Sequence, residues 1–474
     1  MPVIFGLREH STPLTESADL MVTGGRESED ISLRTVEVAG DKSVTHRAVM
    51  SALLPGAPSV LSVRNANSGG AVRALLPALH ALGIRIEAVD GTYTVTRGVP
   101  PVPQGIRPHP TVTRWPDAPY LQTEGSSAAA RLLIGTLAGL GTSAVVDGDD
   151  VLRHRPMEWV VEPLVELGAE IDYLGEPGRL PVLLRGGVRR PGTVRLTVGS
   201  AQARSAVLLA AAAARLPVTV AHPVRSRDHT ERMLAAFGAA LTEEAGHVAY
   251  TGSPYTVAPV IDVPADPSLA AYPAAAHLFH GVGELRVPGV CLNPTRLGFF
   301  EVLRRAGADI TYHDPATGSS GEPVGTVVVR GGLGQVGSVR VDEPELLHAL
   351  IDEVPLLAAV AASLPGTSWI GCAEELRFKE TDRLTTTARM IEAFGGSAEV
   401  RGDGLVVRGG TPLRAGRVAA FEDHRIAMAA ATLASALPGR TTIVGGACYR
   451  TSFPEFAEVQ RAVGVRIVEA ANDD

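Results

Sequence analysis

Residues suited to binding anions recur where the sequence predicts that helices begin. Lys42-Ser43 is followed by His46-Arg47, and Lys379-Glu380 is followed by Asp382-Arg383. Helix N-termini present unpaired N–H groups and the positive end of the helix dipole, so they bind anions readily. The helix dipole disfavours a cation at that end. Arginines found there therefore indicate that bound anions lie between the arginines and the helix ends. The arginines in such places are Arg155, Arg227, Arg383 and Arg425.

Two simpler explanations of this pattern remain open. Ser226, Asn293 and Thr295 are residues that cap helix N-termini whatever the function of the protein. The four arginines could instead form ion pairs with Asp or Glu residues of a neighbouring part of the chain.

Lysine is rare in this chain, and both lysines lie in the clusters just described. The 43 Lys and Arg residues include only Lys42 and Lys379 as lysines, so the other 41 are arginines. A lysine ammonium is a compact charge whose pKa shifts readily on burial, unlike that of the arginine fork. Asp352 precedes Glu380 by 28 residues. A lysine with two carboxylates is a candidate acid–base assembly, because different environments can separate the pKa values of two carboxyl groups.

Composition excludes several classes of protein. A length of 474 residues, 45% hydrophobic residues and 20% charged residues predict a globular protein of at least two domains. A net charge of −8 argues against nucleic-acid binding, and the longest apolar run, 206–214, is too short to span a membrane. Charged residues at 8–10 argue against a signal peptide. Cys291, Cys372 and Cys448 form no CxxC pair, which favours a cytoplasmic protein without disulfides or zinc.

One pattern occurs six times in the sequence: a helical stretch, a step of an apolar residue followed by glycine, and then residues typical of a β-strand. These six units are the elements that must position the candidate anion-binding and acid–base residues. The glycines of the steps are Gly83, Gly168, Gly238, Gly307, Gly395 and Gly464. Glycine suits the residue that closes a helix in the left-handed conformation. Each unit also has a second, alanine-rich helix, which we expect to be buried. These helices begin near Lys42, Ser126, Ser200, Pro267, Leu346 and Asp423, with Asp352 inside the fifth.

Six such units predict an α/β or α+β protein with two domains of three units each. The proline-dotted stretch 254–267 marks the boundary. We expect residues 1–31 to form a mobile tail, 42–258 to form one domain, and 32–41 with 259–474 to form the second.

Taken in order, the motifs resemble those of the 5-enolpyruvylshikimate-3-phosphate synthase family from about Val38 onward. Seven segments carry the resemblance: Gly40-Asp41-Lys42-Ser43 to Arg47, Arg155-Pro156-Met157, Ser200-Ala201-Gln202, Ser226 to Glu231, Asn293 to Arg296, Lys379 to Arg383, and Asp423-His424-Arg425. Ile351-Asp352-Glu353 and Thr451-Ser452-Phe453-Pro454 complete the set.

The resemblance implies a two-domain inside-out α/β barrel of six βαβαββ units, without a cofactor or metal and expected to be a monomer. It implies transfer of the enolpyruvyl group of phosphoenolpyruvate to the 5-hydroxyl of shikimate 3-phosphate, in the shikimate pathway of aromatic amino-acid biosynthesis. Asp352 would accept the hydroxyl proton, Glu380 would protonate the enol methylene, and Lys379 would ligate the substrate and balance charge. The implied ligands of shikimate 3-phosphate are Lys42, Ser43, Arg47, Ser200, Gln202, Asp352 and Lys379, and those of phosphoenolpyruvate are Lys42, Arg155, Gln202, Arg383 and Arg425.

Two departures from the family pattern keep another function open. The family's Asn-(Ser/Ala)-Gly-Thr loop, which packs against phosphoenolpyruvate, is replaced by Glu124-Gly125-Ser126-Ser127-Ala128, and Asn67-Ser68-Gly69-Gly70 replaces an acidic pair. The alternative is a paralogue of specialised metabolism that acts on shikimate or a related cyclitol. It would transfer the enolpyruvyl group to another acceptor, or eliminate water or phosphate. A non-catalytic binding protein is a third possibility, but Asp352, Glu380 and both lysines are present.

Overall fold

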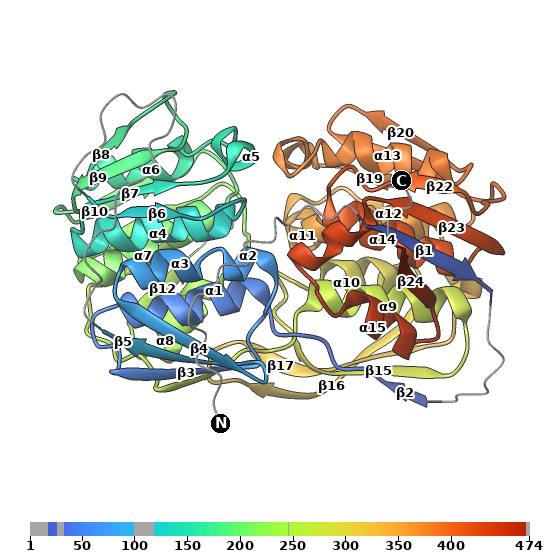
Figure 1. Ribbon diagram of the computed structural model, residues 1–474, viewed down its shortest axis with the longest axis horizontal. Coiled ribbons are helices and arrows are strands. Elements are labelled where there is room, and N and C mark those ends of the chain that lie inside the picture. The colour runs from blue at the N-terminus through green and yellow to red at the C-terminus, as the bar shows by residue number, and fades with distance from the viewer. Residues whose placement is uncertain (1–17, 26–32, 99–117, 245, 471–474) are drawn as a thin grey trace. The chain divides into compact units, whose positions relative to one another are not determined.

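The computed structural model describes residues 18–25, 33–98, 118–244 and 246–470, which form two compact units (Figure 1). Unit 1 comprises the described residues within 1–39, 264–316 and 323–474. Unit 2 comprises those within Gly40–Val263 together with the short segment Thr317–Glu322. The described residues contain six four-stranded sheets, three in each unit. Each sheet combines a parallel strand pair with antiparallel neighbours, which fits six repeats of one βαβαββ pattern.

The sheets of unit 2 surround a core of apolar helices. Helices α4 (Ser127–Leu140) and α7 (Ala201–Ala214) run side by side (Figure 1), and glycines let them approach closely. A Cβ atom at Gly135 would lie 2.2 Å from the carbonyl oxygen of Ala206. The sheets are β14 (Val260–Asp262), β3 (Val60–Arg64), β5 (Thr92–Arg97) and β4 (Ile84–Val89); β6 (Tyr120–Gln122), β7 (Ala144–Asp147), β9 (Val182–Gly186) and β8 (Glu170–Tyr173); and β10 (Gly192–Arg195), β11 (Val218–Ala221), β13 (His247–Tyr250) and β12 (Leu241–Glu244). The helices are α1 (Lys42–Met50), α2 (Gly70–Arg73), α3 (Leu76–Ala81), α4 (Ser127–Leu140), α5 (Asp150–Arg153), α6 (Glu158–Glu166), α7 (Ala201–Ala214) and α8 (His229–Ala236), with a 3-10 turn η1 (Ser51–Leu53).

Unit 1 repeats this plan around its own core. Its sheets are β16 (Asp309–Thr317), β17 (Pro323–Arg330), β15 (Glu284–Cys291) and β2 (Leu33–Thr35); β18 (Arg340–Val341), β19 (Thr367–Ile370), β21 (Gly404–Arg408) and β20 (Ser397–Arg401); and β22 (Arg417–Ala419), β23 (Gly439–Val444), β1 (Asp19–Gly24) and β24 (Arg466–Ala470). Its helices are α9 (Pro267–His280), α10 (Gly298–Arg305), α11 (Pro344–Leu350), α12 (Val354–Ala362), α13 (Arg383–Ala393), α14 (His424–Ser435) and α15 (Phe456–Ala462). Its 3-10 turns are η2 (Leu333–Gln335), η3 (Ile351–Glu353), η4 (Glu374–Phe378) and η5 (Gly446–Thr451).

The six predicted helix-closing glycines all have a positive φ, between 80° and 109°. They therefore adopt the backbone conformation that the sequence pattern indicated. The predicted buried helices are also found, as α1, α4, α7, α9, α12 and α14. One start was wrong: the fifth buried helix begins at Val354, with Pro355 in its first turn, instead of near Leu346. Asp352 accordingly lies in the 3-10 turn η3 before the helix, where proline in the next turn is well tolerated.

Part of the segment that we expected to be a mobile tail is an ordered strand. Strand β1 is central in its sheet, antiparallel to β23 on one side and to β24 on the other. Its Leu20 and Val22 are fully buried, so the strand is held by core packing as well as by ladder hydrogen bonds. The other residues of 1–31 lie outside the described residues, apart from Ala18 and Gly25.

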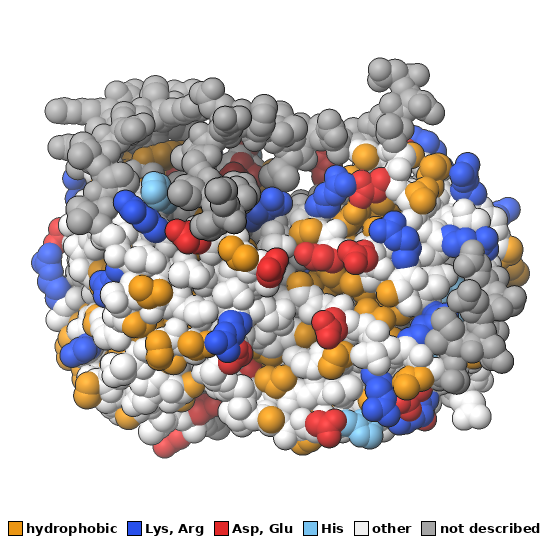
Figure 2. All heavy atoms as spheres, turned by 60° about the horizontal axis from the view of Figure 1, so that its bottom comes forward, with side chains coloured by type: hydrophobic (Ala, Val, Ile, Leu, Met, Phe, Trp, Pro, Cys, Tyr) orange, Lys and Arg blue, Asp and Glu red, His pale blue; other side chains and the backbone are white. Residues whose placement is uncertain are grey.

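Exposed arginines lie among carboxylates on the face shown in Figure 2, where hydrophobic side chains are scattered. Surface pairs such as Arg185–Asp172 and Arg401–Glu399 explain many of the 41 arginines. Exposed pairs of this kind contribute little to stability. The arginines that bear on function are therefore the buried ones.

Candidate active site

In unit 2, the first turn of α1 carries two of the predicted ligands, Lys42 and Ser43. Asp41 caps the helix, and its carboxylate accepts hydrogen bonds from the backbone N–H of Ser43 at 2.7 Å and of Val44 at 3.0 Å. Lys42 and Ser43 are partly buried at this end, whereas Asp41 is fully buried. The cap fixes the backbone direction of the turn, so the Lys42 and Ser43 side chains are held on a rigid element.

Arg47, one turn further along α1, is anchored to neutral groups. It donates from Nε to the Thr230 hydroxyl at 2.7 Å, from Nη2 to the Ser205 hydroxyl at 2.7 Å, and from Nη1 to the Ser43 carbonyl at 2.8 Å. Only 5% of the residue is exposed. Burial lowers the pKa of Arg47 to about 10, although Glu231, Asp41 and Glu322 act in the opposite direction. The guanidinium stays charged at neutral pH and would gain from a bound anion.

His46 connects the first turn of α1 with neighbouring segments. Its Nδ1 lies 2.7 Å from the Lys42 carbonyl oxygen, and its Nε2 lies 3.0 Å from the Ala71 carbonyl oxygen and 3.4 Å from the Ser126 hydroxyl. Burial lowers the pKa of His46 to about 4. The ring is therefore neutral at physiological pH and acts as a fixed hydrogen-bonding group rather than as a cation.

The remaining predicted ligands of unit 2 are Ser200 and Gln202 at the start of α7, and Arg155 between α5 and α6. Ser200 caps α7 by accepting a hydrogen bond from the Ala203 N–H. The Gln202 carbonyl oxygen accepts a hydrogen bond from Arg131 Nη1 at 2.7 Å, and Arg131 also donates to the Pro156 carbonyl at 2.8 Å. This contact turns the Gln202 amide so that its NH2 group is the end left to meet a ligand. Arg155 donates to the Ser127 hydroxyl at 3.3 Å.

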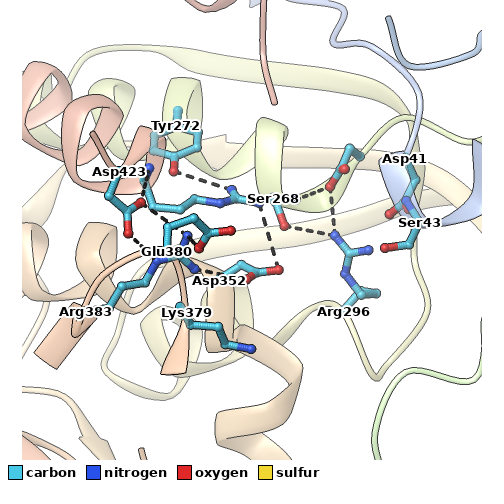
Figure 3. A network of polar contacts seen from close by, with 12 residues as sticks. Asp41, Ser43, Ser268, Tyr272, Arg296, Asp352, Lys379, Glu380, Arg383 and Asp423 are labelled. Atoms are coloured by element: carbon cyan, nitrogen blue, oxygen red, sulfur yellow. Dashed lines mark hydrogen bonds and ion pairs between the residues drawn. The ribbon is translucent and has the colours of Figure 1, made fainter. Parts of the chain in front are cut away.

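In unit 1, one buried arginine binds three carboxylates, as Figure 3 shows. Arg383, at the start of α13, donates from Nε to Asp423 Oδ2 at 2.8 Å and from Nη1 to Asp352 Oδ1 at 3.4 Å, and its Nη2 also contacts Glu380. Asp423 is fully buried and caps α14, whereas the side chains of Asp352 and Glu380 are 18% and 34% exposed. Asp352 and Glu380 are thus the two carboxylates that solvent or a substrate can reach.

Arg425 lies in the first turn of α14 and approaches the same cluster. Its Nη2 is 4.0 Å from Asp352 Oδ2, and its Nη1 is 3.5 Å from the hydroxyl of Tyr272, a fully buried residue of α9. The neighbouring His424 is buried, which lowers its pKa to about 3 and keeps it neutral. Asp352 therefore stands between the guanidinium groups of Arg383 and Arg425.

Lys379 is paired with a carboxylate that precedes it by four residues. Its ammonium group contacts Glu375 in η4, and His348 Nδ1 lies 3.8 Å from the same carboxylate. Burial alone would raise the pKa of Glu375, but Lys379 and His348 outweigh it and the pKa is lowered. The lysine is held at the turn that leads into Glu380 and Arg383.

Known proteins resemble this chain over most of its length. A family model described as EPSP synthase (3-phosphoshikimate 1-carboxyvinyltransferase) matches residues 30–459. The chain belongs to this family. A 3-phosphoshikimate 1-carboxyvinyltransferase of Chloroflexus aurantiacus is 39% identical over 426 residues, which cover 89% of this chain and 94% of the relative. The enzyme of that name from Desulforamulus reducens is 37% identical over 429 residues, with 90% and 96% covered.

Solved structures agree with this assignment. An EPSP synthase from Acinetobacter baumannii has a TM-score of 0.80 and 30% identity, covering 96% of this chain and 100% of that one. The enolpyruvyl transferase NikO from Streptomyces tendae has a TM-score of 0.72 at 18% identity, covering 96% and 99%, and shares the fold. The predicted family, the enolpyruvyl transferase fold and the transferase class are confirmed.

The structure of this EPSP synthase family member brings only some of the predicted site residues into contact. Asp352, Glu380, Arg383 and Arg425 form one connected cluster in unit 1. In unit 2, Ser43 and Arg47 are joined by a hydrogen bond, whereas Gln202 and Arg155 are each held by a neighbour that the sequence prediction did not include.

Four residues of the site were missed as participants: Arg131, Tyr272, Glu375 and Asp423. The sequence contains a pattern that could have identified two of these four residues. Glu375 precedes Lys379 by four residues, the spacing of a helical ion pair, and Asp423 occupies an expected cap position. Arg131 and Tyr272 lie inside apolar helical patterns, and only tertiary packing shows what they contact.

The loop that departs from the family pattern does not place its acid against the arginines. Glu124 is exposed, with φ at 47°, and its backbone N–H donates to Gln122. Ser126 caps α4, and a Cβ atom at Gly125 would lie 3.0 Å from Asp149 Oδ2. The altered segment thus keeps a capped helix start beside Arg155.

No helix among the described residues is both long and apolar enough to cross a membrane.

Proposed function

We propose that this chain transfers the enolpyruvyl group of phosphoenolpyruvate to the 5-hydroxyl of shikimate 3-phosphate and releases phosphate. The observation that carries the proposal is the unit 1 cluster, in which Asp352 and Glu380 share Arg383 while Arg425 approaches Asp352. Two reachable carboxylates on one fixed guanidinium suit a reaction that removes one proton and delivers another. Membership of the EPSP synthase family supports the identity of both substrates.

The proposed chemistry divides between the two carboxylates. Asp352 accepts the proton of the 5-hydroxyl while that oxygen forms a bond to C2 of phosphoenolpyruvate. Glu380 delivers a proton to C3, which becomes a methyl group in a tetrahedral intermediate. The C–O bond to phosphate then breaks as the methyl group loses a proton, and the double bond returns. The products are one enolpyruvyl ether and one inorganic phosphate.

The proposed binding groups are the fixed cations and donors of both units. Lys42, Ser43 and Arg47 of α1, with Ser200 and Gln202 of α7, bind shikimate 3-phosphate, assisted by Asp352 and Lys379. Lys42, Arg155, Gln202, Arg383 and Arg425 surround phosphoenolpyruvate. Preorganised cations stabilise charge that develops in the transition state without reorganisation, which is the largest contribution that such a site can make.

The test is to incubate the protein with both substrates and to measure phosphate release and product mass. We expect one phosphate per enolpyruvyl ether formed, and no release when either substrate is omitted. Unphosphorylated shikimate serves as the control acceptor. Binding of shikimate 3-phosphate without phosphate release would reject the proposal. It would favour the paralogue that acts on a related cyclitol, for which the Ser127–Arg155 contact in the altered loop is the motivating observation.

We also propose that the protein works in the cytoplasm as a monomer. Cys291, Cys372 and Cys448 are all free thiols, as a reducing compartment maintains them. Every proposed ligand comes from one chain. Sedimentation at micromolar concentration should give the mass of a single 49.4 kDa chain, and a dimer would reject the second part of the proposal.

A further inference from the structure

The segment Thr317–Glu322 is a short excursion of the chain that belongs to unit 2. It connects strands β16 and β17, which form part of a unit 1 sheet, so the chain leaves unit 1 after Ala316 and returns at Pro323. The Ser319 hydroxyl accepts a hydrogen bond from the Asp262 N–H at 2.7 Å. Gly321, with φ at 79°, lies so close to α8 that a Cβ atom would be 2.4 Å from the Arg232 carbonyl oxygen. Only glycine fits this position.

The last residue of the segment places a carboxylate in the interior of unit 2. Glu322 and His229 are both fully buried, and Glu322 Oε1 lies 2.8 Å from His229 Nδ1. Arg232 Nε lies 3.8 Å from Glu322 Oε2 and donates to Asp228 at 2.9 Å. A buried carboxylate is costly unless partners hold it, so this contact fixes the start of α8 relative to the segment.

Three consecutive residues at the start of α8 contact three different parts of unit 2. His229 contacts Glu322, the Thr230 hydroxyl accepts from Arg47 Nε at 2.7 Å, and Glu231 pairs with Arg204 of α7 at 2.6 Å. The side chain of Thr230 is short and branched, so its position follows the backbone of this turn. The geometry of Arg47 therefore depends on where Glu322 and His229 hold α8.

From these contacts we infer that Glu322 and His229 are positioning residues for the phosphorylated acceptor. They act through Thr230, which holds Arg47, and they touch neither substrate. The inference rests on the proposed function and goes beyond it. It assigns a role in acceptor recognition to a segment and a helix end outside the predicted ligand set. Among the described residues, the predicted ligand that Thr230 hydrogen-bonds is Arg47. Acceptor binding should therefore respond to this turn and donor binding should not.

The test compares Michaelis constants for the two substrates in Glu322→Gln and Thr230→Val. Loss of a well-aligned contact to a charged group is worth about a tenfold change in affinity. Each variant should therefore raise KM for shikimate 3-phosphate about tenfold and change KM for phosphoenolpyruvate less than about twofold. Thr230→Ser keeps the hydroxyl and should stay within about twofold of the parent in both constants. Combining Glu322→Gln with Thr230→Val should raise KM for shikimate 3-phosphate little more than either change alone, because both residues act through Arg47.

A matched control and a second variant keep the inference falsifiable. Glu284→Gln neutralises a carboxylate that pairs with Arg286 and Arg330 in unit 1, and it should leave both constants unchanged. If Glu322→Gln does not fold, Glu322→Asp withdraws the carboxylate from His229 by one methylene and should give the same shift. Equal increases in both Michaelis constants, or a lowered unfolding temperature with neither constant changed, would overturn the inference.

Calorimetric titration of shikimate 3-phosphate separates failure of this inference from failure of the proposed function. If the parent protein binds the ligand but releases no phosphate from the substrate pair, the proposed function fails while the comparison of dissociation constants still tests the inference. A parent that turns over normally, with Glu322→Gln and Thr230→Val binding as tightly, would reject the inference alone.

Discussion

Arg383 in unit 1 and Arg47 in unit 2 are both buried, but their surroundings differ in kind. Arg383 contacts the carboxylates of Asp423, Asp352 and Glu380, whereas Arg47 donates to two hydroxyls and a backbone carbonyl. Burial lowers the pKa of both, but Asp423 and Glu380 reverse the effect at Arg383, so its pKa is raised. The pKa of Arg47 stays lowered, at about 10.

This difference separates two uses of the same side chain. A guanidinium among carboxylates orients acid–base groups and adds little net charge for an incoming anion. A guanidinium that contacts neutral groups has no carboxylate in contact to balance its charge, so its charge can stabilise a bound anion. We therefore propose that unit 1 is arranged for proton transfer and that the α1 region of unit 2 is arranged for binding a phosphorylated substrate.

The largest expected effect comes from neutralising the unit 1 carboxylates. Asp352→Asn and Glu380→Gln should each lower kcat by about 10²- to 10⁴-fold, because a general base or acid is lost. The affinity for shikimate 3-phosphate, measured by calorimetry, should change much less. Glu374→Gln, on the exposed side of the neighbouring turn η4, is the charge-matched control and should keep the parental rate. A variant at Asp352 or Glu380 with near-parental kcat contradicts the division of roles.

Stability should depend strongly on Asp423, the fully buried carboxylate that binds Arg383. Asp423→Ala leaves a buried guanidinium without its best partner and removes the cap of α14, so the free energy of unfolding should fall by about 3–5 kcal/mol. Asp382→Ala removes the cap of α13 from a partly exposed site and should cost about 1 kcal/mol. Urea denaturation measures both, and equal losses would show that capping alone explains the effect at Asp423.

Two of the buried histidines, His46 in unit 2 and His424 in unit 1, should make stability fall in acid. Each has a folded-state pKa below its unfolded value of 6.5, so the unfolded chain binds more protons below that pH. The stabilisation is present above pH 6.5 and is lost as the pH falls towards about 4. For His46, a drop from 6.5 to about 4 corresponds to about 3 kcal/mol at full effect. His46→Gln should flatten the plot of unfolding free energy against pH between 4 and 6.5, and an unchanged slope would count against a neutral His46.

The smallest of the expected effects on activity is at Arg47. Arg47→Lys keeps the charge but loses the planar fork that contacts Thr230 and Ser205, so KM for shikimate 3-phosphate should rise about tenfold to thirtyfold. The kcat value and KM for phosphoenolpyruvate should stay within about threefold. A large fall in kcat with an unchanged KM for the acceptor would place Arg47 with the unit 1 residues instead.

Local signals made much of the fold predictable from the sequence. The six helix-closing glycines and the caps at Asp41, Ser126, Ser200 and Asp423 are short-range patterns, because a helix end must satisfy its own backbone groups. Strand β1 was not predicted, because its partners β23 and β24 are more than 400 residues later in the sequence. Nothing in a six-residue segment identifies partners at that separation.

The same distinction applies to the site. Asp352, Glu380, Arg383 and Arg425 were predicted as site residues from motifs, and tertiary packing sets the partner of each. Arg131 and Tyr272 could not be found, because an arginine or tyrosine in an apolar helix looks like a core residue until its contact is known. The pairing of Glu322 with His229 joins residues 93 positions apart and had no sequence signal.

The most direct test of the division between the units is the mass of the product formed in D2O. Proton delivery to C3 followed by loss from the methyl group predicts that the enolpyruvyl ether of shikimate 3-phosphate carries deuterium in its methylene group, with one phosphate released per product. Glu380→Gln should form this product far more slowly while still binding shikimate 3-phosphate. An enolpyruvyl product without deuterium, or phosphate release without that product, would contradict the account.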